Sequence, residues 1–443
     1  MKNKQHHRLF SGLLQRKRFN RFLRILGPGV VTGAADDDPS GIATYSQAGA
    51  AYGFGLLWLF PIMYPMLLAV QESCARIGAV TGRGLASILR DHYSKKLLFS
   101  AVTLVVVANT INIGADLGAM AATAQLLVPL PFEVLAVIFA VVVLLLEIFV
   151  SYKTYARILK WLAIALLAYP VTAFLVGLPW LEVLQATVTI DLSRIGESAT
   201  IFLIVGLIGT TISPYLFFWD TSEVVEGEIA THRLRSAGSS PKVTRHFIRT
   251  IRLDNFTGMS LASLTAWFIV VTCASVLFSH GITNIETAAD AARALEPLVA
   301  GFPYAGLVAK LIFSFGIIGI GLLAVPVLAG SSSYAISEAL GWKEGLYRKF
   351  RRAHGFYGII ILATLVGLLI NFLGINPIQA LVFTAVLNGL AAVPLLWMLL
   401  RIGNNRAILG EYTNGRLSNF FIRFTLVVMT LAALILGWSF IAG

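Results

Sequence analysis

Three consecutive carboxylates interrupt an apolar run near the start of the chain, 27-GPGVVTGAADDDPSGIATYSQAGAAYG-53. An unpaired carboxylate deep in a bilayer is costly, so we expect such groups to face water or the interior of a helix bundle. In a helix, neighbouring side chains point about 100° apart, so not all of them can face one ion. The acids are Asp36, Asp37 and Asp38. We predict Asp38 as a direct cation ligand and place Asp36 and Asp37 behind it or along the permeation path.

The residues after these acids predict a helix that is broken in its middle. Pro39 lacks a backbone donor, and Gly41 weakens a helix. We expect Asp38 to cap the second half-helix, with Pro39 in its first turn. The first half then ends in free carbonyls, which carry partial negative charge. Carbonyls beside a carboxylate at mid-membrane predict a cation site.

The same pattern recurs in 205-VGLIGTTISPYLFFWDTSEVV-225. Here Ser213 can cap a second half-helix that begins at Pro214. Pro39 and Pro214 lie 175 residues apart. A matching pair of interrupted helices in two halves of a chain indicates an inverted-repeat transporter with a midplane site. For Pro214 by itself, a kink that only serves packing is the alternative.

Polar residues in two other runs are further candidates. Asn109, Asn112 and Asp116 follow each other at helical spacings of three and four, so they share one helix face. That face predicts either a water-filled lining or hydrogen bonds between helices. Asn388 is a weaker candidate for approaching the ion.

The composition places these breaks in a membrane protein. Of the 443 residues, 57% are hydrophobic and 13% are charged, and the mean hydropathy is +0.80. Soluble domains average about 25% charged residues. This excludes a disordered chain and an ordinary soluble enzyme. Continuous apolar runs of about 20 residues favour helices over strands. We predict eleven spans, at 27–50, 54–79, 97–128, 133–150, 155–177, 196–224, 254–279, 300–333, 355–374, 377–402 and 419–441.

The basic residues predict the topology. With eleven spans, 31 of the 34 Lys and Arg residues fall on the side of the N-terminus, and cytoplasmic loops are rich in Lys and Arg. We therefore expect a bacterial plasma-membrane protein with its N-terminus inside and its C-terminus outside. The basic residues that give the net charge of +12 then contact anionic lipid headgroups rather than nucleic acid. The predicted organisation is a basic cytoplasmic tail over 1–26 and one transmembrane transporter domain over 27–443, with repeats at about 27–177 and 196–402 and an extra helix at about 419–441.

Catalytic signatures are missing from the sequence. It has no HExxH, GxxxxGK[ST], GxSxG or glycine-rich dinucleotide motif. We therefore predict a protein that is not an enzyme, with no cofactor and no obligatory protein partner. Cys74 and Cys273 lie in apolar runs and are predicted to be small core residues.

Several motifs resemble a known family. The stretches 27-GPG-29, 38-DPSGIAT-44 and 47-QAGA-50 are similar to the first span of the natural resistance-associated macrophage protein family of divalent metal transporters, where the motif is Asp-Pro-Gly-Asn. The stretch 209-GTTISPY-215 resembles its sixth span, where Met-Pro-His is usual. The resemblance is closest to the divergent, magnesium-transporting branch. It implies an all-α, LeuT-like polytopic fold of eleven transmembrane helices, with a 5+5 inverted repeat, broken helices 1 and 6, and one C-terminal helix.

The resemblance also implies a metal site. Asp38 corresponds to the metal-binding Asp, and Thr210 stands where a backbone carbonyl binds the metal. Gly41 replaces a ligand Asn, and Ser213 replaces a ligand Met. Without the thioether, the site loses its preference for soft or borderline ions. A wider, all-oxygen site suits Mg²⁺, which sheds water reluctantly. We expect Mg²⁺ as the substrate, with Mn²⁺ as a second one.

Two further departures bear on proton coupling. Tyr215 stands where the family has a His, and Ala119 stands where it has a Glu, while Asp116 is kept. Tyr titrates near pH 10, so it is a poor proton relay at neutral pH. We expect weak or absent proton coupling during alternating access. A proton-coupled Mn²⁺ or Fe²⁺ transporter of the usual family type, a symporter for a small organic solute, and a membrane enzyme are the alternatives.

Overall fold

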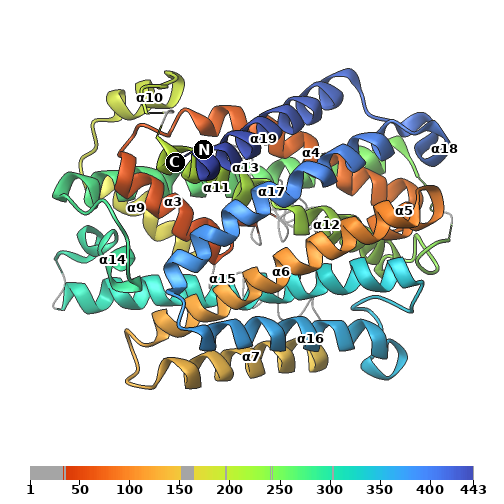
Figure 1. Cartoon of the computed structure of the whole chain (residues 1–443), viewed down its shortest axis with the longest axis horizontal. Helices are drawn as coiled ribbons and strands as arrows, with labels where there is room; N and C mark the ends of the chain where they lie inside the picture. Colours follow the sequence, from red (N-terminus) through yellow and green to blue (C-terminus); the bar gives the residue numbers. More distant parts are fainter. Residues whose placement is uncertain are drawn as a thin grey trace, which may run out of the picture.

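The computed structural model describes residues 33, 36–150, 164–194, 197–239, 241, 243–301 and 304–442. This part of the chain is helical and contains no strand (Figure 1). The predicted tail over 1–26, most of the first half of the first span and the start of the fifth span lie outside it. The helices are α3 (Pro39–Tyr52), α4 (Leu59–Thr81), α5 (Leu85–His92), α6 (Lys95–Ala124), α7 (Phe132–Phe149), α9 (Ala168–Leu175), α10 (Trp180–Val188), α11 (Ser198–Thr211), α12 (Pro214–Ala230), α13 (Arg245–Val276), α14 (Ala288–Arg293), α15 (Ala305–Leu340), α16 (His354–Ile370), α17 (Pro377–Gly403), α18 (Arg406–Leu409) and α19 (Arg416–Ala442), with 3₁₀ turns at Ile164–Leu167, Phe278–His280, Glu296–Val299, Phe350–Arg352, Asn371–Leu373 and Gly410–Tyr412.

Eight helical segments in the described residues are long and apolar enough to cross a membrane. They are α6, α7, α11 with α12, α13, α15, α16, α17 and α19, and each coincides with a predicted window. Helices α3 and α4 coincide with two more windows. The total of eleven remains a prediction, because parts of the first and fifth spans are outside the described residues.

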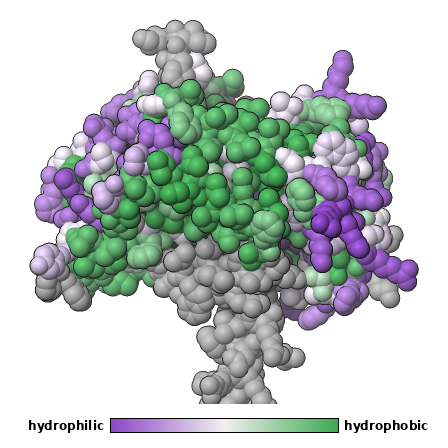
Figure 2. Space-filling view, turned by 90° about the horizontal axis from the view of Figure 1, so that it is seen from below, coloured by the Kyte–Doolittle hydropathy of each residue, from purple (hydrophilic) through white to green (hydrophobic). Residues whose placement is uncertain are grey.

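The outer surface carries the apolar belt that a bilayer requires. Figure 2 shows hydrophobic residues in a broad band across the middle of one face, with hydrophilic residues at both ends. Helices α7 and α16 lie nearest that face (Figure 1). Their exposed apolar side chains include Val134, Val137, Val141, Leu362, Leu365 and Leu369.

The two breaks lie where the sequence placed them. Helix α3 begins at Pro39 with Asp38 as its N-cap, and the Asp38 side chain accepts from the backbone N–H of Gly41. Helix α11 ends at Thr211, and α12 begins at Pro214 after Ser213 in the N-cap position. Proline at the first helical position lacks only an N–H that would be unsatisfied anyway.

Close helix packing holds the two breaks against the rest of the bundle. Helix α3 packs against α13, α17 and α11, and α11 packs against α17. At Gly209 the main chains of α11 and α17 come so close that a Cβ atom would lie 2.6 Å from the Cα of Gly389. Glycine therefore brings α17 against the end of α11, next to the second break.

Candidate metal centre

The Asp38 carboxylate lies at the first break and is fully buried. Its Oδ1 atom accepts hydrogen bonds from the Ser40 hydroxyl at 2.6 Å and from the Gly41 N–H at 2.8 Å. Its Oδ2 atom accepts from the Asn112 side-chain amide of α6 at 2.9 Å. The predicted cap is confirmed. Three donors from two helices fix the direction of the carboxylate.

The second break differs from the prediction at Ser213. We expected its side chain to cap α12, and this was wrong. The hydroxyl of Ser213 instead turns back and donates to the carbonyl of Thr210 at 2.7 Å, with the carbonyl of Gly209 at 3.3 Å. The last carbonyls of a helix have no intrahelical partner, and here the serine hydroxyl supplies a donor to them. The Ser213 side chain also interacts with the neighbouring Tyr215 side chain.

The two breaks meet each other. The Ser40 hydroxyl lies 3.5 Å from that of Thr210, and a Cβ atom built on Gly41 would lie 3.1 Å from the same Thr210 oxygen. A chain of contacts thus connects the four predicted metal residues. The Thr210 side chain also takes up part of the space that the missing side chain at Gly41 leaves.

The donors gathered at this point are all oxygen atoms. They comprise the Asp38 carboxylate, the hydroxyls of Thr210 and Ser213, and the carbonyls at the end of α11. Within the described residues, no group of three His, Cys, Asp or Glu side chains has a metal-holding arrangement. A cation here would depend on one carboxylate, hydroxyls, carbonyls and water, which is ligation typical of hard ions.

Further buried acids surround Asp38. Asp36, Asp37 and Asp116 are each at most 3% exposed. Both carboxylate oxygens of Asp116, and Oδ1 of Asp36, have no hydrogen-bond partner. None of the four acids forms an ion pair within the described part of the chain. Their negative charge is therefore uncompensated by protein cations there, and a buried charge of this kind requires a counter-ion or a proton.

The polar face of α6 divides between the two roles that the sequence left open. Asn109 bonds to α15, donating to the carbonyl of Leu328 at 3.1 Å and to the hydroxyl of Ser332 at 3.0 Å. Asn112 instead holds Asp38, and its own Oδ1 atom has no partner. Asn109 therefore joins two helices, whereas Asn112 and Asp116 belong with the site.

Asn388 is the least satisfied amide in this region. It is fully buried in α17, and neither its nitrogen nor its oxygen has a hydrogen-bond partner. It adjoins Gly389, whose main chain touches that of Gly209 beside the second break. A buried unpaired amide costs free energy unless a ligand or water completes it.

Two neighbours of the site escaped the sequence analysis. Ser40 was recognised as part of a break but not as a donor to Asp38. The Tyr45 hydroxyl lies 3.1 Å from that of Thr211 and so ties α3 to the end of α11. Tyr45 lies seven residues after Asp38, which is two helical turns, and this spacing was the only available signal.

The Tyr215 side chain is fully buried, and the charges of Asp38, Asp36 and Asp116 act on it.

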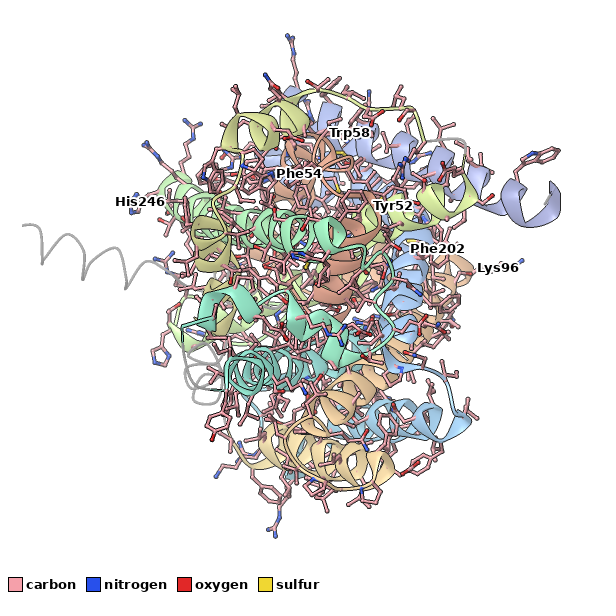
Figure 3. The ribbon with its side chains drawn as sticks, turned by 90° about the vertical axis from the view of Figure 1, so that its left-hand side faces the viewer. Tyr52, Phe54, Trp58, Lys96, Phe202 and His246 are labelled. Carbon is pink, nitrogen blue, oxygen red and sulfur yellow. The ribbon has the colours of Figure 1, made fainter. Side chains whose placement is uncertain are left out.

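A small space lies beside α3, on the side of α14. The space between α3, α6, α14, α15 and α17 has a volume of about 10 Å³, which holds about one water molecule. Figure 3 labels Tyr52, the last residue of α3, together with Phe54 and Trp58, which follow that helix. The hydroxyl of Thr200 in α11 donates to that of Tyr52 at 2.9 Å.

Two solved structures share this arrangement of helices. The manganese transporter of Eremococcus coleocola, in complex with an aromatic bis-isothiourea substituted compound, has a TM-score of 0.73 at 17% identity, covering 94% of this chain and 86% of that one. MhsT in complex with L-phenylalanine has a TM-score of 0.62 at 13% identity, covering 93% and 98%. At these identities the likeness concerns the fold alone. The chain is thus an apolar helical bundle with the fold of these two proteins and with helices long enough to cross a membrane.

Sequence comparison identifies the family. The model of natural resistance-associated macrophage protein-like proteins matches residues 29–439, and the chain belongs to this family. The divalent metal cation transporter MntH of Ralstonia nicotianae is 26% identical over 434 residues, which cover 96% of this chain and 93% of that protein. Because the family consists of transporters, the prediction that this chain is not an enzyme is confirmed.

Proposed function

We propose that this protein is a secondary transporter of divalent metal cations, with Mg²⁺ as its main substrate and Mn²⁺ as a second one. The observation that carries this proposal is the meeting of two broken helices at an all-oxygen site beside four buried acids. The metal is bound by Asp38, Thr210 and Ser213, and Gly41 supplies no side-chain ligand. The names of the relatives support a divalent metal and point to manganese.

The choice of Mg²⁺ depends on Ser213 and Gly41. A hydroxyl in place of a thioether removes the ligand that favours softer ions. A glycine in place of an asparagine removes one side-chain ligand, so the ion keeps water in that position, and Mg²⁺ gives up its water reluctantly. Asn112, Asp116 and Asn388 then hold Asp38 or the ion's water. An Mn²⁺-selective site of the usual family type is the alternative.

We further propose that transport runs without strong proton coupling. Tyr215 and Ala119 stand where the family has its titratable His and Glu. A membrane potential of about 100 mV is worth about 2.3 kcal/mol per charge, hence about 4.6 kcal/mol for a divalent ion. This is enough for accumulation by potential alone. With the N-terminus inside a bacterial plasma membrane, the potential drives cations into the cell.

The inverted repeat is also a proposal. The breaks at Asp38 and Ser213 begin matching half-helices, α3 and α12, each opened by a proline. Alternating access would then follow from movement of one repeat against the other around the shared site. The organic-solute alternative has the MhsT-like fold in its favour. Three buried acids at the first break argue against a substrate carboxylate there.

The test is uptake by proteoliposomes of the full chain. Mg²⁺, Mn²⁺, Ca²⁺ and Cd²⁺ are offered in turn, with a pH dye inside and an imposed potential. We expect Mg²⁺ and Mn²⁺ uptake that follows the potential, without matching acidification. Metal-linked acidification would overturn the coupling proposal, and uptake of Cd²⁺ in preference to Mg²⁺ would overturn the selectivity.

A pair of variants assigns the selectivity to one residue. Ser213→Met restores a thioether, so we expect the ratio of Cd²⁺ to Mg²⁺ uptake to rise at least tenfold. Ser213→Ala is the control, because it removes the hydroxyl without adding sulfur, and its ratio should stay near that of the wild type. An unchanged ratio in Ser213→Met would mean that residue 213 does not face the ion.

A further inference from the structure

A hollow of about 750 Å³ opens between α17 and α19, and an adjoining one of about 460 Å³ lies along α19. Arg423 lines both of them. They lie where α17 ends and α19 begins, at the same end of the molecule as α5 and α18 (Figure 1). We call this feature the α17–α19 groove. Its defining residues are Trp397, Arg401, Arg416, Phe420, Arg423 and Phe424.

The groove is positively charged. Arg401, Arg416 and Arg423 are exposed and line it, and no acidic side chain lines either hollow among the described residues. None of the three forms an ion pair within the described part of the chain. The guanidinium of Arg401 lies 5.1 Å from the ring centre of Trp397, which keeps it at the wall of the groove. A guanidinium group without an acidic partner can bind two oxygens of one phosphate at the same time.

A second basic hollow differs, because most of its arginines form ion pairs. It has a volume of about 480 Å³ and lies between α4, the start of α13 and the loop before α19. Three of its four arginines have acidic partners: Arg76 and Arg252 pair with Glu72 at 3.0 and 2.7 Å, and Arg245 pairs with Glu411 at 3.6 Å. In the α17–α19 groove, by contrast, none of the three arginines has an ion-pair partner within the described residues.

The groove continues into an apolar surface. Phe420 is 60% exposed and Phe424 is 38% exposed, and their rings stack at 6.1 Å one turn apart on α19. Val427, Leu431 and Leu434 extend the exposed apolar surface along the same helix. From Arg423 to Leu434 the helix rises by about 16 Å, which is about half the hydrocarbon thickness of a bilayer. The surface thus has the length of an acyl chain in one leaflet.

We propose that the α17–α19 groove binds an anionic phospholipid of the leaflet at the basic end of the molecule. Arg401 and Arg423 hold the phosphate, and Arg416 adds positive charge beside it. The acyl chains lie along Phe420 and Phe424. A free phosphate ion would use the arginines but not the aromatic surface, so the two-part character of the groove selects a lipid. The bound lipid bridges the last helix and α17, which carries Asn388.

The test measures lipid retained by the purified full-length chain. The protein is taken from mixed phosphatidylglycerol and phosphatidylcholine vesicles into mild detergent, and bound lipids are counted by native mass spectrometry. We expect preferential retention of phosphatidylglycerol. Each arginine near anionic lipid is worth about a fivefold change in affinity, so Arg401→Gln with Arg423→Gln should weaken retention about 25-fold. Arg401→Lys with Arg423→Lys should keep most of it.

The matched control removes the same charge elsewhere. Arg351 and Arg352 are exposed in the turn before α16, away from α19 (Figure 1). Their double Gln variant should retain phosphatidylglycerol as the wild type does. A separate measurement needs no variant: raising salt from about 50 to 500 mM should strip phosphatidylglycerol while leaving phosphatidylcholine unaffected.

Three results would overturn the proposal. One is equal retention of the two lipids by the wild type. Another is undiminished phosphatidylglycerol retention in the Arg401→Gln, Arg423→Gln variant with an unchanged unfolding temperature. The third is displacement of the lipid by millimolar inorganic phosphate, because that would make the groove a site for free anions.

Discussion

Replacing Asp38 by Asn separates the charge of the site from its shape. Oδ1 of the new side chain can still accept from Ser40 and Gly41, as the carboxylate does at 2.6 and 2.8 Å. The new amide nitrogen would face the amide nitrogen of Asn112. Because Asn112 Oδ1 has no partner, turning that amide over supplies the missing acceptor. We therefore expect α3 to keep its cap, whereas Asp38→Ala would lose about 1 kcal/mol with it.

The effect on metal binding is electrostatic. Two unit charges 4 Å apart attract by about 4 kcal/mol at an effective dielectric constant of about 20. A divalent ion doubles this value before desolvation is counted. Taking the single-charge figure as the net loss, the affinity should fall about a thousandfold. Asp36, Asp37 and Asp116 cannot compensate, since three hydrogen bonds aim Asp38 alone at the meeting point of the breaks.

The assay compares Mg²⁺ and Mn²⁺ uptake in proteoliposomes with the unfolding temperature of the same preparations. Asp191→Asn is the control, because it removes one negative charge from an exposed loop position. We expect uptake by Asp38→Asn to fall below detection while its unfolding temperature stays within a few degrees of the wild type. If the folded variant transports within tenfold of the wild type, Asp38 is not a ligand.

Three further predictions concern stability. Glu72→Ala removes the partner that Arg76 binds at 3.0 Å, and because Arg76 is only 2% exposed, the folded protein should lose about 3 kcal/mol of stability. Arg252→Ala removes a partner of Glu72 that is 58% exposed, so it should cost under about 1 kcal/mol; equal melting shifts in the two variants would contradict this. Gly209→Val has no room against α17 and should lower the melting temperature far more than valine at a glycine with open surroundings; similar shifts would refute the close approach. Burial, with a smaller contribution from Glu338, raises the pKa of Glu344 to about 9 from 4.5. Its contribution to stability is complete below pH 4.5 and is lost as the pH rises toward about 9. Melting curves should therefore show Glu344→Gln gaining on the wild type between pH 5 and 9, and a constant difference would speak against it.

The breaks were predictable because their causes are local. Asp38 reaches the N–H of Gly41 three residues away, and Pro39 sets its own backbone angle. The helix windows were predictable for a similar reason, since hydropathy over 20 residues measures what a bilayer accepts. The direction of Ser213 was not, although its partners are near in sequence. Ser213 lies between the end of α11 and the start of α12. The turn of the chain between these two helices decides which of them its hydroxyl bonds.

Contacts between distant segments were beyond the sequence. Asn109 and Asn112 share a face of α6, yet one bonds to α15 and the other to Asp38. Their spacing is common to both outcomes, and only the positions of the neighbouring helices separate them. The α17–α19 groove is a similar case. Arg401 and Arg423 are ordinary basic residues in the sequence, and they line one hollow because two helices place them together.

The sequence by itself determined the class of protein, the two interruptions and the Asp38 cap of the half-helix that follows the first one. These follow from hydropathy, from proline and capping chemistry, and from the cost of a charge in a bilayer, all of which act within a few residues. The tertiary structure decided which oxygens meet across the breaks, which acids stay unpaired and where free arginines gather. Those features depend on contacts between residues that are far apart in the chain, and no local sequence pattern specifies such contacts.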